Sequence, residues 1–91
     1  MKALPSTVTP YKRTSEFDEN TVPAGLLKSH STKKGVWAKI IILEGELTYR
    51  ILEPIVEEIK LTSKSFGVVE PTIKHEVVPA LGVRFYVEFY R

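Results

Sequence analysis

The sequence predicts an all-β domain, folded as a small antiparallel sandwich or barrel with very little helix. Short segments in which apolar and polar residues alternate recur along the chain, a period-two pattern typical of strands with one buried face. Glycine, proline or clustered polar residues separate these segments at intervals of about eight to twelve residues. About seven short strands without a long helical repeat therefore indicate this architecture.

Residues 1–30 are predicted to form an irregular arm. Pro5, Pro10 and Pro23 lie there among hydroxyl and charged residues, and proline interrupts both helices and hydrogen-bonded ladders. The segment 15–20 is suited to a single helical turn, but Pro23 prevents anything longer.

Residues 36–43 should form the central strand, because β-branched and aromatic side chains fill that segment. Apolar and polar residues then alternate over residues 47–51, as in a strand with one face in a core. A two-residue link containing Gly45 separates the two segments. Such a link is typical of a hairpin, so we expect the two strands to be antiparallel neighbours.

The second half of the chain predicts four more strands. Residues 55–61 fit either a short helix or a strand, and the preceding Pro54 with the polar cluster that follows favours a strand. Residues 66–71 and 75–79 form two short strands, and alternation over 83–90 buries one face of the last strand. The barrel strands are thus expected within 31–91.

Length and composition limit the class of protein. The chain has 91 residues, 43% of them hydrophobic, and we treat 1–91 as a single domain. A net charge of +2 is too small for a nucleic-acid-binding surface, and the absence of cysteine excludes disulfides and thiolate sites. A domain this small with apolar surface to cover is expected to form a homodimer.

The sequence lacks membrane and targeting signals. No apolar stretch approaches the roughly 18–20 residues that cross a bilayer. No hydrophobic signal region follows Met1-Lys2. We therefore expect a cytoplasmic location without membrane association.

His30 and His75 are the two histidines and the main candidates for chemistry. One hypothesis is that folding brings them together as a metal-binding or acid–base pair, since neutral imidazole is the commonest protein metal ligand. A tight site needs three or four ligands, so Glu44, Glu70, Glu76 or a water would have to be added, and spacing does not select among them. The alternative is two unrelated histidines at the surface or in turns.

The other polar groups indicate ordinary surface roles. The serines have no Gly-x-Ser-x-Gly elbow, so a hydrolase triad is not indicated. Near Trp37, solvated lysines are favoured over a nucleic-acid patch; they are Lys28, Lys33, Lys34 and Lys39. Because Lys39 interrupts an apolar strand, its side chain either lies exposed beside Trp37 or projects into a polar cavity.

Several short motifs follow one another in an order that is more specific than any one of them. A histidine precedes Thr-Lys-x-Gly-x-Trp-x-Lys, then Leu-x-Gly-x-Leu, Val-Glu-Pro-x-x-x-His and a closing aromatic strand. Their residues are His30, Thr32-Lys33, Gly35, Trp37, Lys39, Leu43, Gly45, Leu47, Val69-Glu70-Pro71, His75 and Phe89-Tyr90. This order resembles the small cupin-like domain of the tellurite-resistance protein B family, over most of the chain from about residue 10 onward.

The resemblance implies a cupin-like double-stranded β-helix, with His30 and His75 at the same barrel opening. This chain lacks the His-x-His pair and the glutamate of metal-binding cupins, so His30 and His75 are the remaining metal ligands, with Glu70 as first choice for a third. Ligand or metal should be lost as pH falls through about 6.5, the reference histidine pKa. Because His75 begins a short strand, we do not expect it in the core, so His75→Ala and His30→Ala should weaken binding and leave the fold intact.

The functional hypothesis is a non-enzymatic cupin-like domain, associated with tellurite (oxyanion) resistance and stress response. It would bind a small molecule, oxyanion or metal at the barrel mouth through His30, His75 and Glu70. A divalent zinc, nickel or iron ion is the candidate cofactor. One alternative is a metal-dependent cupin enzyme using His30 and His75; another is an accessory domain of an S-adenosylmethionine-dependent tellurite methyltransferase. A third is an interaction module that docks by the arm or an exposed strand.

Overall fold

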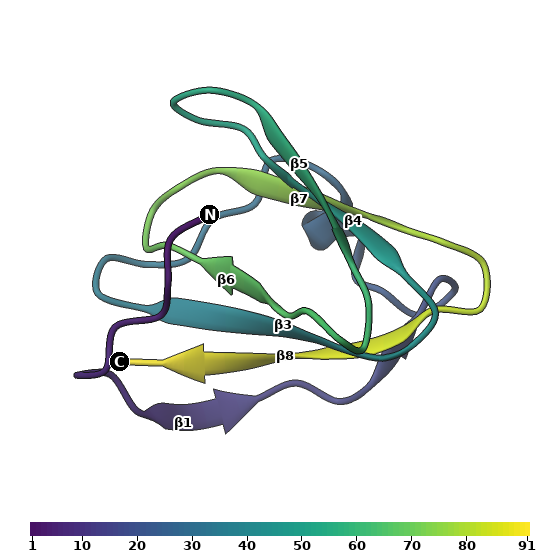
Figure 1. Cartoon of the computed structure of the whole chain (residues 1–91), viewed down its shortest axis with the longest axis horizontal. Helices are drawn as coiled ribbons and strands as arrows, with labels where there is room; N and C mark the ends of the chain where they lie inside the picture. Colours follow the sequence, from purple (N-terminus) through teal and green to yellow (C-terminus); the bar gives the residue numbers. More distant parts are fainter.

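The protein, described by a computed structural model over residues 1–91, consists of two antiparallel β-sheets and one short 3-10 helix. Figure 1 shows the smaller sheet lying across the larger one. The larger sheet contains β1 (Pro10–Arg13), β2 (Phe17–Asp18), β3 (Trp37–Glu44), β6 (Gly67–Val69) and β8 (Arg84–Tyr90). The smaller contains β4 (Leu47–Ile51), β5 (Glu57–Leu61) and β7 (His75–Pro79), and the helix is η1 (Ala24–Leu27).

The two sheets differ in which parts of the sequence supply their strands. The larger sheet has the order β1-β8-β3-β6, with β2 also paired to β8, so it joins the two ends of the chain to its middle. The smaller sheet has the order β5-β4-β7. Both consist entirely of antiparallel pairs.

The core lies between the inward faces of the sheets. In β3, Ala38, Ile40 and Ile42 are buried, whereas Lys39 and Ile41 on the opposite face are partly exposed. The predicted alternation in β4 is likewise confirmed. In β8 it holds through Val87, whereas Tyr90, expected on the outer face, is buried and Phe89 is half-buried. The inward side chains of both sheets form one cluster of 12 buried residues. Burial on two facing sheets is therefore what holds the layers together.

Lys39 was predicted either to lie exposed beside Trp37 or to project into a polar cavity, and it is half-buried on the face of β3 that points away from the core. Its Nζ lies 4.5 Å from the ring centroid of Phe66, outside the core. A cation over an aromatic face keeps its hydration while covering apolar surface, so a charge is tolerated within this strand.

The predicted all-β class is confirmed, but the single closed barrel is wrong. No strand of the larger sheet is hydrogen-bonded to a named strand of the smaller one, so the structure is two facing sheets. The predicted hairpin across Gly45 is wrong for the same reason, because β3 pairs with β6 and β8 while β4 pairs with β5 and β7.

The link at Gly45 passes from one sheet to the other. Its φ is +74°, and a Cβ there would lie 3.0 Å from the Cα of Val83 and 3.2 Å from the carbonyl oxygen of Gly82. Glycine is required by both the backbone conformation and this close approach. The local signal marked the end of β3 correctly, but the link is a bend between two sheets and not a hairpin turn.

The first 30 residues are more regular than the predicted irregular arm. They contribute β1, β2 and η1, and both strands pair with β8. The helical turn expected near residues 15–20 is instead a β2 strand followed by a turn, in which the Asp18 carboxylate accepts hydrogen bonds from the N–H groups of Asn20 and Thr21. Pairing with an exposed edge of β8 explains why weak local strand signals still give strands. No helix has the length and apolar character needed to cross a membrane.

Candidate functional site

His30 and His75 meet although 44 residues separate them along the chain. The N–H of His30 donates to the carbonyl of His75 at 2.7 Å, and the N–H of His75 donates to the carbonyl of His30 at 2.8 Å. Their ring centroids are 5.4 Å apart, with the planes at 85°. The expected proximity of the two imidazoles is thus confirmed, and the alternative of two unrelated histidines is wrong.

The loop before β7 supports this pair. The N–H of Thr72 donates to the carbonyl of Thr32 at 3.1 Å, so the segment after His30 is attached to the segment before His75 at a second point. Thr72 has φ +65°, a conformation that non-glycine residues rarely adopt. The Thr32 hydroxyl also donates to the Val36 carbonyl at 2.7 Å. These contacts fix the backbone on both sides of the imidazoles.

His75 is a core residue, contrary to the expectation that it would not be one. It is 4% exposed, and its ring centroid lies 5.7 Å from that of Tyr49 in an edge-to-face arrangement. Its Nδ1 lies 3.2 Å from the carbonyl oxygen of Ile73. Removing this side chain would therefore disturb packing as well as any binding, so His75→Ala is not the innocuous variant that the sequence suggested.

The electrostatics of His75 follow from this burial. Desolvation lowers the pKa of His75 below 6.5, and His30 lowers it further, while the hydrogen bond to the Ile73 carbonyl partly opposes both. The imidazole is therefore neutral at pH 7, because burial disfavours its charged form.

Both histidines line a cavity of about 240 Å³ between the two sheets. Most of its wall is apolar, and it is supplied by the arm and by both sheets. Representative wall residues are Phe17, Leu26, Ile40, Val77, Phe85 and Val87. A concave apolar site with a few polar groups is the usual form of a small-molecule site.

Two threonines complete the polar part of the wall, and both are engaged by the protein itself. Thr32 donates to the Val36 carbonyl, and Thr14 donates to the Ser15 carbonyl at 2.8 Å while accepting from the N–H of Val87 at 3.0 Å. Thr14 and Thr32 were not among the site residues expected from the sequence. Nothing in a threonine's local sequence indicates that a distant strand will place it on a cavity wall.

Glu70 is not brought to the histidines. It lies in a separate depression of about 440 Å³ with Met1, Lys2 and Glu57, and its Oε1 is 3.5 Å from the Nζ of Lys2. Nowhere in the chain do three His, Asp or Glu side chains converge as a metal ion would require. Two imidazoles without a carboxylate do not fit the ligand set of a tight divalent site.

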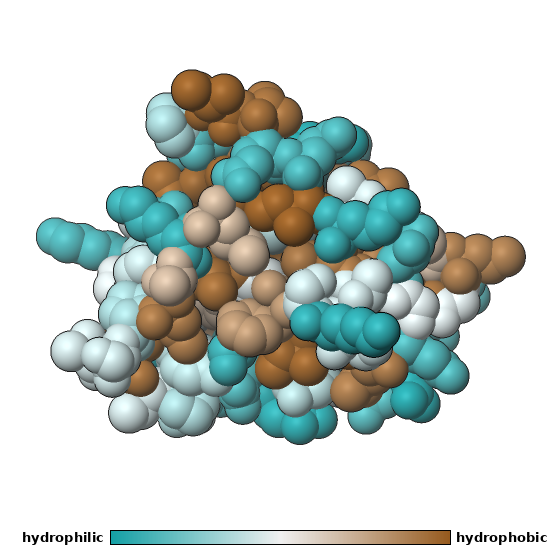
Figure 2. Space-filling model, in the orientation of Figure 1, coloured by the Kyte–Doolittle hydropathy of each residue, from teal (hydrophilic) through white to brown (hydrophobic).

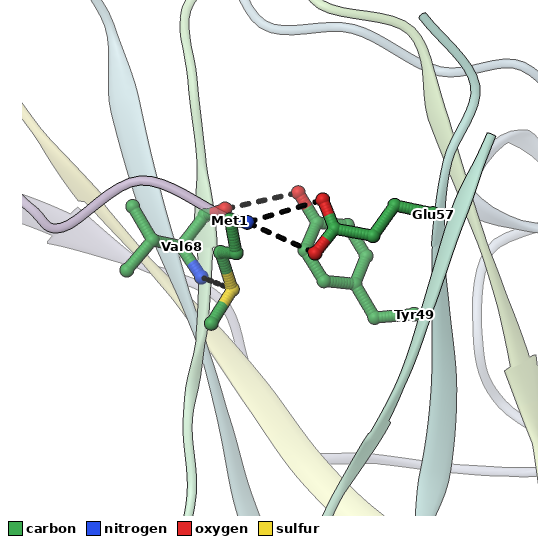
Figure 3. A network of polar contacts seen from close by, with 4 residues as sticks. All are labelled: Met1, Tyr49, Glu57 and Val68. Atoms are coloured by element: carbon green, nitrogen blue, oxygen red, sulfur yellow. Dashed lines mark hydrogen bonds and ion pairs between the residues drawn. The ribbon is translucent and has the colours of Figure 1, made fainter. Parts of the chain in front are cut away.

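The depression borders a polar network (Figure 3). The N-terminal amine of Met1 lies 3.0 Å from Glu57 Oε2, and the Met1 Sδ lies 3.1 Å from the N–H of Val68. The Tyr49 hydroxyl donates to the Val68 carbonyl at 3.0 Å. Burial and the charges of Glu70 and Glu57 raise the pKa of Tyr49, so it remains a protonated donor.

Tyr49 therefore connects the cavity at His75 with the polar network around Val68. Its ring packs on His75, and its hydroxyl is held at the network around Val68. The alternation of residues 47–51 indicates a buried Tyr49, and a buried phenol needs a partner for its hydroxyl. That signal was present in the sequence, although the identity of the partner was not.

Comparison with known proteins places the chain in a family. A family model described as a TehB-like domain matches residues 12–87. Comparison with curated protein sequences finds no match.

Two solved structures share the fold. One is a protein from Escherichia coli strain K12, with a TM-score of 0.89 and 20% identity over 100% of this chain and 97% of that one. The other is TehB from Haemophilus influenzae, with a TM-score of 0.85 and 26% identity over 91% of this chain and 31% of TehB. This chain thus spans about a third of the length of TehB.

Proposed function

We propose, from the premise that this chain belongs to the TehB-like domain family, that it is a small-molecule-binding domain which serves tellurite resistance without catalysing a reaction itself. Its site is the cavity that ends at His30 and His75. We also propose that the fold is related to the cupin-like double-stranded β-helix. Two facing antiparallel sheets are compatible with that topology.

The apolar cavity is the observation that carries this proposal. No lysine or arginine lines it, and burial keeps His75 neutral. An oxyanion placed there would lose its hydration without gaining a cationic partner, which is strongly unfavourable. A compact and mostly apolar neutral molecule is therefore favoured over the oxyanion itself.

A direct test uses benzene as the probe and backbone amide NMR shifts as the readout. Titration should move the resonances of residues on the cavity wall and leave those around Met1 and Glu70 unchanged. Ala38 is 1% exposed on the cavity wall, so Ala38→Leu should fill the space and abolish the shifts. Ala3→Leu, the same change at an exposed position, is the matched control. Absence of shifts in the wild-type protein, or shifts confined to the Met1 depression, would contradict the proposal.

An accessory role beside a methyltransferase is a second candidate. The match to less than a third of TehB supports it, because the remainder of that protein lies outside the matched region. Deleting the matched region from Haemophilus influenzae TehB would test whether the rest of the protein depends on it. An unchanged activity and stability of the remainder would count against this role. A metal-dependent enzyme is not proposed, because no third ligand accompanies the histidines.

Self-association stays a prediction. The loops between β4 and β5 and between β7 and β8 project from the body in Figure 1, and Figure 2 shows apolar atoms at both extremities. These loops carry Ile55, 79% exposed, and Leu81, 91% exposed. Light scattering at high micromolar concentration should give the mass of a dimer. The mass of a monomer would contradict the predicted self-association.

A further inference from the structure

The hydrogen bond of His75 determines which of its nitrogens is free. A carbonyl oxygen only accepts, so the contact of 3.2 Å between Nδ1 and the Ile73 carbonyl requires a proton on Nδ1. In a neutral imidazole the other nitrogen then carries a lone pair and no proton. Nε2 of His75 is consequently a hydrogen-bond acceptor.

This acceptor has no partner within the protein. The Nδ1 contact is the single hydrogen bond that the His75 ring makes, and no buried side-chain nitrogen or oxygen is both inaccessible and unpaired. The atom therefore keeps access to a neighbouring molecule, although the residue is 4% exposed and lies on the cavity wall. An acceptor of this kind is costly to leave without a donor in an apolar setting.

The other polar side chains on the wall do not compete for this role. The hydroxyls of Thr14 and Thr32 already donate to backbone carbonyls. His30 also borders a surface depression with Lys12 and Lys33, so its ring has access to a second, more polar surface. His75 is the buried polar group left to meet a ligand inside the cavity.

We propose that the cavity selects neutral molecules with a compact apolar body and one O–H or N–H group, which donates its hydrogen to Nε2 of His75. This inference rests on the proposed ligand-binding function and specifies the chemical class of the ligand. Molecules without a donor leave Nε2 unpaired. A fully deprotonated anion brings only acceptors toward Nε2, and any anion would lose its hydration in this cavity without a cationic partner.

The experiment compares phenol with toluene, which differ by replacement of the hydroxyl with a methyl group of similar size. Dissociation constants are measured by amide shift titration for the wild-type protein, His75→Phe and His30→Phe. The ratio of the toluene constant to the phenol constant should fall about tenfold or more in His75→Phe, as expected for loss of one buried hydrogen bond. In His30→Phe the ratio should change less than about twofold, because that ring does not supply the acceptor.

The outcomes separate the two proposals. If both probes bind in the cavity but the ratio of their dissociation constants is the same in wild type and His75→Phe, the proposed hydrogen bond to Nε2 is wrong. The proposed binding function then still stands. If neither probe binds the wild-type protein, both are wrong. Should His75→Phe fail to fold, imidazole ¹⁵N NMR of the wild-type protein still decides. Nδ1 should carry the proton and the Nε2 resonance should shift on addition of phenol, whereas a proton on Nε2 would overturn the inference.

Discussion

The cavity at His75 and the depression at Glu70 lie at the two ends of one short loop, residues 70–74, yet they are chemically opposite. The cavity is walled by apolar side chains and holds a neutral imidazole. The depression is bordered by charged groups, among them Lys2, Glu57 and Glu70. Ion pairs exposed to water contribute little, whereas a single buried polar atom strongly affects what can bind beside it. The less charged region is therefore the more selective one.

The largest expected effect on the free energy of unfolding comes from a substitution on the cavity wall. Phe85 is 0% exposed, and its ring centroid lies 5.7 Å from that of Phe17. Phe85→Ala should lower the free energy of unfolding by about 3–5 kcal/mol, since it removes a large buried ring and enlarges the cavity. Urea unfolding measures this. The control is Phe66→Ala, at a side chain that is 47% exposed beneath Lys39, where the loss should stay below about 1 kcal/mol. Equal losses would show that the cavity wall is not the stabilising region.

The second prediction tests how closely the two sheets approach each other at Gly67. A Cβ at Gly67 would lie 2.8 Å from Leu61 Cδ1 and 3.2 Å from Tyr49 Cδ2. Gly67→Ala should therefore destabilise the protein by about 1–3 kcal/mol through overpacking. Gly25→Ala is the matched control, because a Cβ there meets nothing within 4 Å. Thermal unfolding of both variants checks the difference, and an unchanged midpoint for Gly67→Ala would mean that Leu61 moves aside freely.

A third prediction concerns pH. Burial lowers the pKa of His75 in the folded protein below 6.5, so between these two values the unfolded chain binds more protons than the folded one. Stability due to the neutral imidazole is thus complete above pH 6.5 and is lost as pH falls toward the folded pKa. The slope from this one group cannot exceed about 1.4 kcal/mol per pH unit. Urea unfolding from pH 7.5 to 5 should show the decline, and His75→Phe should remove this contribution. An equal decline in both proteins would assign it to other groups.

Local pattern predicted the faces of the strands but not their partners. Alternation in residues 47–51 correctly placed Leu47, Tyr49 and Ile51 in the core. The glycine link before them was predicted to be a hairpin, but β3 and β4 belong to different sheets. A tight turn sets the direction of the next strand only when the chain stays in one sheet. Here the link leaves the larger sheet and lies against Val83, near the far end of the sequence.

The candidate site was predictable in part for a similar reason. The pairing of His30 with His75 was expected from the order of motifs that resembles a known family, and local pattern alone left it open. Glu70 was misassigned because β6 is buried at Gly67, Val68 and Val69 alike, so alternation gives no direction for the residue that follows. The strand ends there, and Glu70 is directed instead to Lys2. Long-range contacts of this kind leave no trace in local sequence.

The smallest expected effect lies in the charged depression. The Met1 amine and the Glu57 carboxylate are 3.0 Å apart, but the Glu57 side chain is 48% exposed. Glu57→Gln keeps the size of the side chain and removes its charge, so it should lower the free energy of unfolding by less than about 1 kcal/mol, because water screens the pair. The loss should shrink further in 0.5 M salt, where the Debye length falls to a few ångströms (about 3–5 Å). Urea unfolding at low and high salt measures both values. Benzene titration of the same variant should match that of the wild-type protein, since this carboxylate is not on the cavity wall. A loss well above 1 kcal/mol would mean that water screens this pair less than its exposure implies. Altered benzene binding would mean that the charged depression and the apolar cavity are coupled.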